Sequence, residues 1–153
     1  MNRKIVDFYL DDDNHWVALL ECAHGQHVRH QPPFVNREWT QTRTGREAML
    51  ETELNCLKCE RLELPQGVRA YKETPVFTQD SVPAGLLRDH ATKAGVWGRI
   101  HVLAGTLSYS VTAPFKYTWT LSPDVIGVIA PEVLHHVTSI GDVRFKVEFM
   151  RVA

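Results

Sequence analysis

The chain has 153 residues, of which 44% are hydrophobic and 23% are charged, and both fractions are ordinary for a folded globular protein. Its 17 basic and 18 acidic side chains give a formal net charge of −1, so no overall positive field attracts nucleic acid or an anionic membrane. No apolar run approaches the roughly 20 residues that span a bilayer, and the N-terminus lacks the apolar stretch of a secretory signal. We therefore expect a cytoplasmic protein with no membrane partner, for which nucleic acid is a disfavoured partner.

Short strands are predicted in the first 30 residues. Lys4–Tyr9, His15–Cys22 and Gln26–His30 are rich in strand-forming residues, and the sharp Ala23-His24-Gly25 reversal joins the last two into a hairpin. The cluster of aspartates at Asp11–Asn14 is typical of a turn, because these side chains hydrogen-bond nearby backbone donors.

One short helix is predicted between this hairpin and the last two cysteines. Thr44 and Glu47 have the spacing of a capping box, which predicts a helix from about Gly45 to Glu53. Leu50 and Leu54 lie four residues apart and would therefore mark its buried face.

All three cysteines of the chain lie in the first 60 residues, close in sequence to histidines. Cys56-Leu57-Lys58-Cys59 can wrap one edge of a tetrahedral zinc site, and Cys22 and His24 at the tight turn can supply the other edge. His27 and His30 remain alternatives for the fourth ligand. With four protein ligands no position is left for a substrate water, so the zinc would be structural and would stabilise a small domain.

Two other interpretations of the cysteines are weaker. The first is a pair of buried thiols beside surface histidines. The second is a redox-active Cys-x-x-Cys motif, but no βαβ pattern surrounds it.

The chain becomes almost entirely strand-like after the predicted linker at Glu60–Gly67. The predicted domains are therefore residues 1–60 and residues 64–153. In Val143–Val152 apolar and polar residues alternate with a period of two, which indicates a strand with one buried face. The other candidate strands are Val76–Thr78, Gly95–Leu103, Thr106–Val111, Tyr117–Leu121, Val125–Ile129 and His135–Ser139. Many short strands separated by turn residues favour a sandwich or a barrel.

Several ordered stretches of the second half resemble one known family. They are Tyr71–Thr78, Pro83–Gly85, His90–Gly98, Val102–Leu107 and Pro131–Val137. Together they resemble the cupin-like domain at the N-terminus of tellurite-resistance protein B, over roughly residues 64–152. The first half resembles a separate, uncharacterised bacterial domain with a Cys-x-His…Cys-x-x-Cys pattern. The resemblance implies a mainly β protein: a zinc-stapled hairpin module with one short helix, then a cupin-like double-stranded β-helix barrel, often dimeric, so a homodimer is expected.

Cupins hold a metal with histidines and a carboxylate, and the resemblance implies which residues here match them. His90 and His135 match two ligand positions, whereas Thr92 and Gly98 stand near positions where the family has ligands. His90 and His135 are therefore the candidate ligands of a second divalent metal, which water, Asp89, Glu148 or His136 would have to complete. A structural role for both histidines is the alternative.

Arg99 and His101 share a strand face and could bind an oxyanion inside the barrel, with a surface salt bridge as the alternative. Trp97, Trp119, Phe145 and Phe149 are expected in the core.

Three functions compete at this stage. The leading hypothesis is a small-molecule or oxyanion binding protein of the stress-response kind with a structural zinc module. The alternatives are a metal-dependent cupin enzyme of the oxygenase or isomerase class, and a protein-interaction module formed by residues 1–60. Longer relatives carry an S-adenosylmethionine-dependent methyltransferase domain. Methyl transfer is not expected here, because no glycine-rich strand–loop–helix segment occurs to bind that cofactor.

Overall fold

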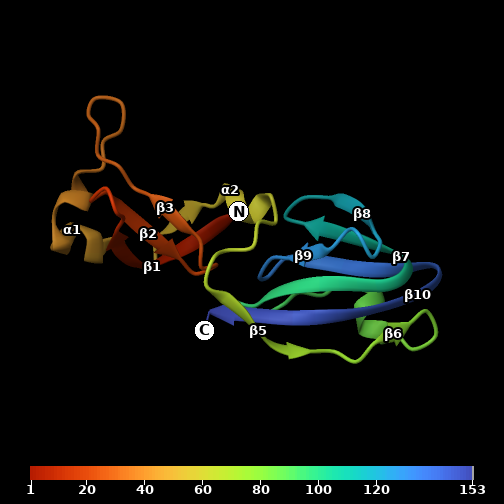
Figure 1. Cartoon of the computed structure of the whole chain (residues 1–153). Coiled ribbons are helices and arrows are strands. Elements are labelled where there is room, and N and C mark those ends of the chain that lie inside the picture. The colour runs from red at the N-terminus through yellow and green to blue at the C-terminus, as the bar shows by residue number, and fades with distance from the viewer. Residues whose placement is uncertain (153) are drawn as a thin grey trace. The chain divides into compact units, whose positions relative to one another are not determined.

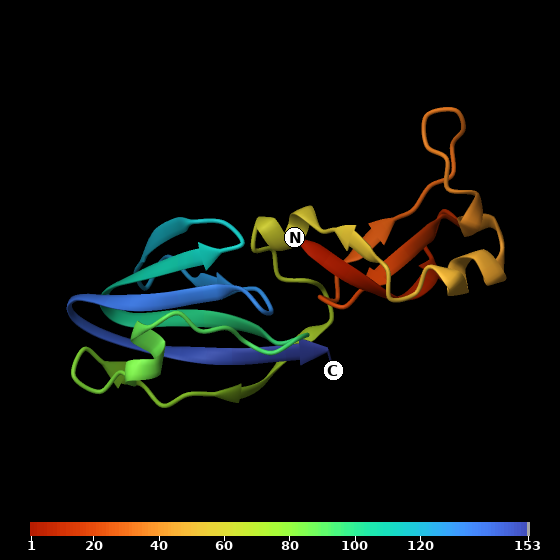
Figure 2. The ribbon, with the colours of Figure 1, turned by 180° about the vertical axis from the view of Figure 1, so that it is seen from behind.

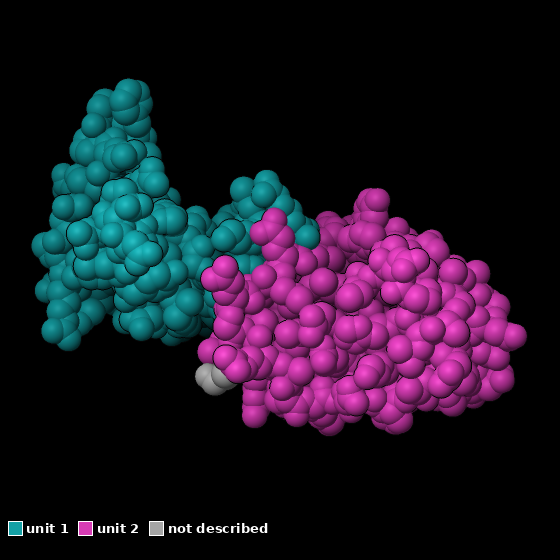
Figure 3. Space-filling view, in the orientation of Figure 1, with its two compact units in different colours: residues 1–61 teal, residues 62–153 magenta. Residues whose placement is uncertain are grey.

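Antiparallel strands form most of the regular secondary structure, and the chain divides into two compact units (Figures 1 and 3). The computed structural model describes residues 1–152. Unit 1 is Met1–Arg61 and unit 2 is Leu62–Ala153. Short helices account for the remaining regular structure, so the protein is mainly β. None of the helices within residues 1–152 has the length and apolar character that a membrane crossing requires.

Unit 1 contains a four-stranded antiparallel sheet in the order β3-β2-β1-β4. Its strands are β1 (Asn2–Leu10), β2 (Trp16–Leu20), β3 (Gly25–His27) and β4 (Glu53–Asn55). Its core contains the fully buried side chains of Ile5, Ala18, Leu20 and Val28. The sheet brings the β2–β3 turn and the end of β4 into the same unit although they are far apart in sequence.

The helices of unit 1 differ from the prediction. They are η1 (Glu38–Gln41), α1 (Arg43–Ala48) and α2 (Leu57–Glu60). The Oγ1 atom of Thr42, not that of Thr44, accepts the capping hydrogen bond from Gly45 N at 3.0 Å. Glu47 pairs with Arg43 at 2.9 Å instead of reaching back to a capping residue.

Helix α1 also ends earlier than expected. Its C-cap is Met49, and Leu50 beyond it is 36% exposed, so the expectation that Leu50 marks a buried helix face was wrong. An additional side chain at Gly45 would overlap the backbone of Trp39. The contact with η1 therefore fixes where α1 begins, which the capping pattern alone did not indicate.

Unit 2 is a curled six-stranded sheet (Figure 2). Its main order is β5-β10-β7-β8, with β6 paired to β10 and β9 paired to β7. The strands are β5 (Val68–Glu73), β6 (Phe77–Thr78), β7 (Trp97–Ala113), β8 (Tyr117–Leu121), β9 (Gly127–Ile129) and β10 (Leu134–Val152). A short 3-10 helix, η2 (Ala84–Leu87), precedes β7. The expected double-stranded β-helix cupin barrel is not confirmed by this architecture.

Four predicted strands of unit 2 are in fact two long ones. The breaks between these predicted strands, at Ala104-Gly105 and at Ile140–Asp142, carry turn residues but lie inside β7 and β10. The register between the two strands shifts there, between Ile140 and Val143. Gly105 and Gly141 have φ values of +80° and +66° at this point. Such an irregularity bends both strands together, which curls the sheet without ending either strand.

The core of unit 2 lies on one face of these strands. Trp97 and Phe145 are fully buried, and Phe77 contacts Phe145 edge to face at 5.7 Å between ring centroids. Trp119 and Phe149 are only half-buried. Trp119 instead stacks on Tyr109, with ring centroids 5.3 Å apart.

Replacing Gly105 by alanine should destabilise unit 2 more than the same change at Gly141. Both residues have positive φ, but a Cβ at Gly105 would overlap the carbonyl oxygen of Asp142, whereas a Cβ at Gly141 meets nothing within 4 Å. We expect a loss of about 3 kcal/mol or more for Gly105→Ala and about 1 kcal/mol for Gly141→Ala. Hydrogen exchange of the β7 and β10 amides measures this for unit 2 alone. Equal losses would contradict the close contact between the strands.

Candidate functional site

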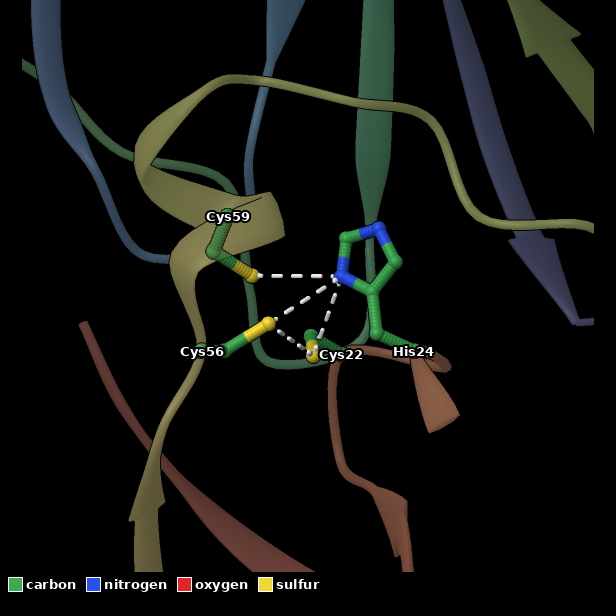
Figure 4. A group of neighbouring side chains, drawn as sticks. All are labelled: Cys22, His24, Cys56 and Cys59. Atoms are coloured by element: carbon green, nitrogen blue, oxygen red, sulfur yellow. Dashed lines mark hydrogen bonds between the residues drawn. The ribbon is translucent and has the colours of Figure 1, made fainter. Parts of the chain in front are cut away.

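Three cysteines and one histidine meet inside unit 1 (Figure 4). Cys22 and His24 come from the turn between β2 and β3, and Cys56 and Cys59 come from the first turn of α2. The turn is tight: Leu20 N donates to His24 O at 2.9 Å, and Ala23 has a φ of +74°. Helix α2 begins directly after Cys56, so one turn of helix places both of its cysteines on the same side.

The distances within this cluster are those of a ligand tetrahedron. His24 Nδ1 lies 3.5 Å from Cys22 Sγ, 3.4 Å from Cys56 Sγ and 3.6 Å from Cys59 Sγ. Cys22 Sγ lies 3.9 Å from Cys56 Sγ. A zinc ion with ordinary bond lengths separates its ligands by about 3.5 Å for S···N and about 3.8 Å for S···S. One ring nitrogen cannot serve three sulfur atoms by hydrogen bonding, so a central cation explains the arrangement better.

All four side chains of the cluster are buried, and its electrostatics favour the thiolate form at Cys56. Cys22 and Cys59 are 0% exposed, Cys56 3% and His24 4%. Hydrogen bonds from Cys22 and Cys59 lower the pKa of Cys56, while hydrogen bonds to Cys56 and Cys59 raise the pKa of Cys22. Burial acts to lower the pKa of His24, but the neighbouring thiols outweigh it and raise that pKa to about 9. The buried negative charge thus attracts a positive partner.

The structure brings His24, and not the alternative histidines, to the thiols. His27 Nε2 lies 2.8 Å from a carboxylate oxygen of Asp11. His30 Nδ1 accepts a hydrogen bond from Arg37 N at 3.0 Å. Both rings are therefore engaged elsewhere in the unit.

A second group of metal-ligand types, Asp11, Asp13 and His15, lies on the surface between β1 and β2. Asp11 Oδ1 accepts hydrogen bonds from the backbone N of both Asp13 and His15 at 2.9 Å. These bonds close the predicted turn and account for the position of the aspartate without an ion.

Unit 2 contains a cavity of about 360 Å³ against the inner face of β7 and β10. Most of its wall is apolar, including Ile100, Val137, Phe145 and Val147. Leu86 and Val96 close it from the segment before β7. The alternation in Val143–Val152 indicated Phe145 and Val147 as inward-facing. No sequence signal marked Leu86 and Val96, and the expectation that Arg99 and His101 face inward had placed Ile100 on the opposite face. A volume of this size is within the roughly 300–1,000 Å³ typical of small-molecule sites.

His90 and His135 lie together in this cavity. Their backbones exchange two hydrogen bonds of 2.9 Å, and their ring centroids are 4.2 Å apart. His90 Nδ1 lies 2.9 Å from Arg88 O, and His135 Nδ1 lies 2.8 Å from Val133 O. A carbonyl only accepts, so each Nδ1 carries a hydrogen, and Nε2 is the ring nitrogen that remains available as an acceptor.

No third metal ligand joins these two histidines within residues 1–152. Asp89 is hydrogen-bonded to His136 Nδ1 at 2.7 Å, and Thr92 donates its hydroxyl hydrogen to Val96 O. The predicted second metal site is therefore supported only by the meeting of His90 and His135.

Arg99 and His101 do not line the cavity. Both contact Glu148 on β10, with Arg99 Nη2 at 2.6 Å and His101 Nε2 at 3.4 Å from the same oxygen, Oε1. Burial raises the pKa of Glu148, but these hydrogen bonds outweigh it and hold the pKa below its usual value. The two residues predicted to bind an oxyanion are thus matched by a carboxylate of the protein.

Comparisons with known proteins divide the chain at the same region. Residues 6–63 match the family described as a protein of unknown function (DUF3565). Residues 72–147 match the TehB-like domain. The relatives below support the TehB family for unit 2.

Two curated relatives are both named probable S-adenosyl-L-methionine-dependent methyltransferase TehB. The protein of Haemophilus influenzae Rd is 31% identical over 83 residues, which is 47% of this chain and 27% of the relative. The protein of H. influenzae strain 10810 is 29% identical over the same length and the same shares. This chain therefore spans about a quarter of the length of the curated relatives that it matches.

Two crystal structures share the fold. TehB from H. influenzae has a TM-score of 0.54 and 26% identity, covering 57% of this chain and 32% of its own. A protein of Escherichia coli K12 has a TM-score of 0.54 and 23% identity, covering 60% of this chain and 97% of its own. The second likeness concerns the fold alone.

These relatives overturn the functional hypothesis from the sequence. The hypothesis of a small-molecule or oxyanion binding protein of the stress-response kind was wrong, because the relatives are named as methyltransferases. The cupin enzyme and the interaction module are no better supported, and the cupin and β-barrel labels conflict with the same relatives. The expected relationship to tellurite-resistance protein B is supported.

The ring of His135 should remain neutral well below pH 6. Burial lowers its pKa from 6.5 to about 4. The unfolded chain then binds more protons than the folded one between these values. Stability should fall by about 3 kcal/mol as the pH drops through this window. An NMR titration of the histidine ring carbons measures the pKa directly.

The His135→Gln variant is the control for this titration. It should lack this part of the acid destabilisation. A pKa for His135 between 6 and 7 would show that water reaches the ring.

Proposed function

We propose that unit 1 binds a single structural zinc ion through Cys22, His24, Cys56 and Cys59. The observation that carries the proposal is the tetrahedral spacing of three sulfurs and one nitrogen, all within 4.8 Å of one another and all buried. Three thiolates and an imidazole are a donor set that suits zinc. Four protein ligands leave no open position, which supports a structural role over a catalytic one.

The zinc would link two segments that are far apart in the sequence. Cys22 and Cys56 are 34 residues apart, and the four ligands together would join the β2–β3 turn to α2. Unit 1 has only 61 residues, and units of this size commonly need a metal or another crosslink. When bound, the ion neutralises the buried thiolates and holds both segments in place.

Metal analysis of the untagged full chain tests this proposal. We expect one zinc ion per chain, and we expect Cys56→Ala to lose it together with the amide protection of β1 and β2. The matched controls are His27→Ala and His30→Ala, because both residues were alternative ligands and neither contacts the thiols. Wild-type protein that stays folded without zinc would contradict the structural role of the ion. Loss of zinc in a control variant would contradict the assignment of the four ligands.

We also propose that unit 2 takes part in S-adenosylmethionine-dependent methyl transfer by holding the methyl acceptor. Its similarity to proteins named as methyltransferases supports the reaction class. Its cavity next to His90 and His135 is where an acceptor would bind.

The chemistry of the cavity favours an acceptor over the cofactor itself. S-adenosylmethionine carries a carboxylate, an ammonium and a sulfonium, and buried charges require matched partners. Among residues 1–152, two lysines but no carboxylate line the cavity, so the ammonium and sulfonium of the cofactor would have no matching partner there. A separate cofactor-binding domain would hold the methyl donor, consistent with the large part of each curated relative that lies outside the match.

Labelled methyl transfer tests this second proposal. The full chain is mixed with methyl-labelled S-adenosylmethionine, thiophenol as probe acceptor, and H. influenzae TehB from which the matched 83 residues have been removed. Added chain should increase label in thioanisole at least tenfold, and His135→Leu should remove most of the gain. His136→Leu is the control, because His136 does not line the cavity. No gain from the wild-type chain would contradict the proposal.

A further inference from the structure

The two histidine rings that line the cavity of unit 2 both use their Nδ1 atoms to hydrogen-bond backbone carbonyls. His135 is 1% exposed, and its Nδ1 hydrogen is used by Val133 O. Its Nε2 has no hydrogen-bond partner within residues 1–152. His135 lines the cavity, so this acceptor is open to a molecule bound there, and a hydrogen-bond donor of that molecule can satisfy it.

Neighbouring hydroxyl groups do not supply that donor. Tyr109, whose ring lies 5.7 Å from that of His135, donates its hydroxyl hydrogen to Val128 O at 2.9 Å. Thr92 donates to Val96 O at 2.7 Å. Both hydroxyls are therefore committed to the backbone.

His90 adds a second acceptor beside the first. Its Nδ1 also hydrogen-bonds a carbonyl, that of Arg88, at 2.9 Å, so Nε2 is the ring nitrogen that remains available as an acceptor. Burial lowers the pKa of His135 to about 4, which supports an unprotonated Nε2 on that ring at neutral pH. The rest of the wall is mainly apolar, so the cavity offers two acceptors in apolar surroundings.

We infer that this cavity selects a small, mostly apolar molecule that carries one X–H hydrogen-bond donor, of the thiol or phenol type, with His135 and His90 as acceptors. The inference rests on the proposed function, in which X–H is the methyl acceptor. An oxyanion is excluded from the contact with the rings, because its oxygens would face two imidazole lone pairs. Lys72 and Lys93 also line the cavity but are exposed side chains.

The hydrogen bond from X–H to Nε2 of His135 would also distinguish the methyl acceptor from the methylated product. In the transfer, the X–H bond breaks and an X–CH₃ bond forms, while the S–CH₃ bond of the donor breaks and its electron pair stays on sulfur. The proton of X–H is released to solvent. The methylated product has no hydrogen to donate, so it leaves Nε2 of His135 unpaired and binds more weakly. Methylation by itself would then favour product release.

Phenol and anisole test the inference, because they differ by the O–H that becomes O–CH₃. Each is titrated into the ¹⁵N-labelled full chain, and amide shifts around the cavity report binding. One hydrogen bond predicts roughly fivefold tighter binding of phenol than of anisole. His135→Leu should abolish the preference, whereas His136→Leu should keep it, because His136 is paired with Asp89 and does not line the cavity.

The outcomes separate this inference from the proposed function. Equal affinity for phenol and anisole in the wild-type chain would overturn the inference, even if labelled methyl transfer succeeds. If phenol binds fivefold more tightly than anisole but no methyl transfer is observed, the inferred selectivity of the cavity is supported. The proposed role in methyl transfer is then wrong. If the spectrum of His135→Leu shows an unfolded unit 2, His90→Leu replaces it and should reduce the preference at least twofold. If a folded histidine variant still binds phenol fivefold more tightly than anisole, the histidines are not the acceptors, and the inference is overturned.

Discussion

The pairing of β7 with β10 is the interaction on which unit 2 depends, because each other strand of its sheet hydrogen-bonds to one of these two. The pair extends from Leu134 opposite Ala113 to Met150 opposite Trp97. Its irregularity at Gly105 lets both strands bend without losing the ladder. The bend gives the sheet an inner face against which the cavity forms, and the start of β10 carries His135 into that cavity.

Unit 1 depends on a different constraint. Its sheet has only short strands beyond β1, and its core is correspondingly small. The four buried metal-ligand side chains occupy positions that apolar residues would fill in a larger domain. Thiols packed this closely repel one another once ionised, so without a cation the cluster would oppose the fold that it occupies. A bound ion reverses the sign of that interaction.

The polar groups of unit 2 belong to two sets with different roles. Arg99, His101 and Glu148 neutralise one another, which makes them a structural network. His90 and His135 satisfy only one nitrogen each against the backbone and keep the other available to the cavity. The sequence suggested Arg99 and His101 as the ligand-binding residues, but His90 and His135 are the pair that faces the cavity.

The sequence by itself indicated the cluster of metal-ligand residue types in unit 1 and the β character of the whole chain. Cysteine spacing and two-residue alternation depend only on local geometry, so Cys56 and Cys59 and the inward face of β10 could be predicted. The choice of His24 over His27 and His30, the long strands in place of predicted turns, and the buried pairing of His90 with His135 required the tertiary structure. Each of these is decided by contacts between segments distant in sequence, and the backbone bonds between His90 and His135 span 45 residues that no local pattern connects.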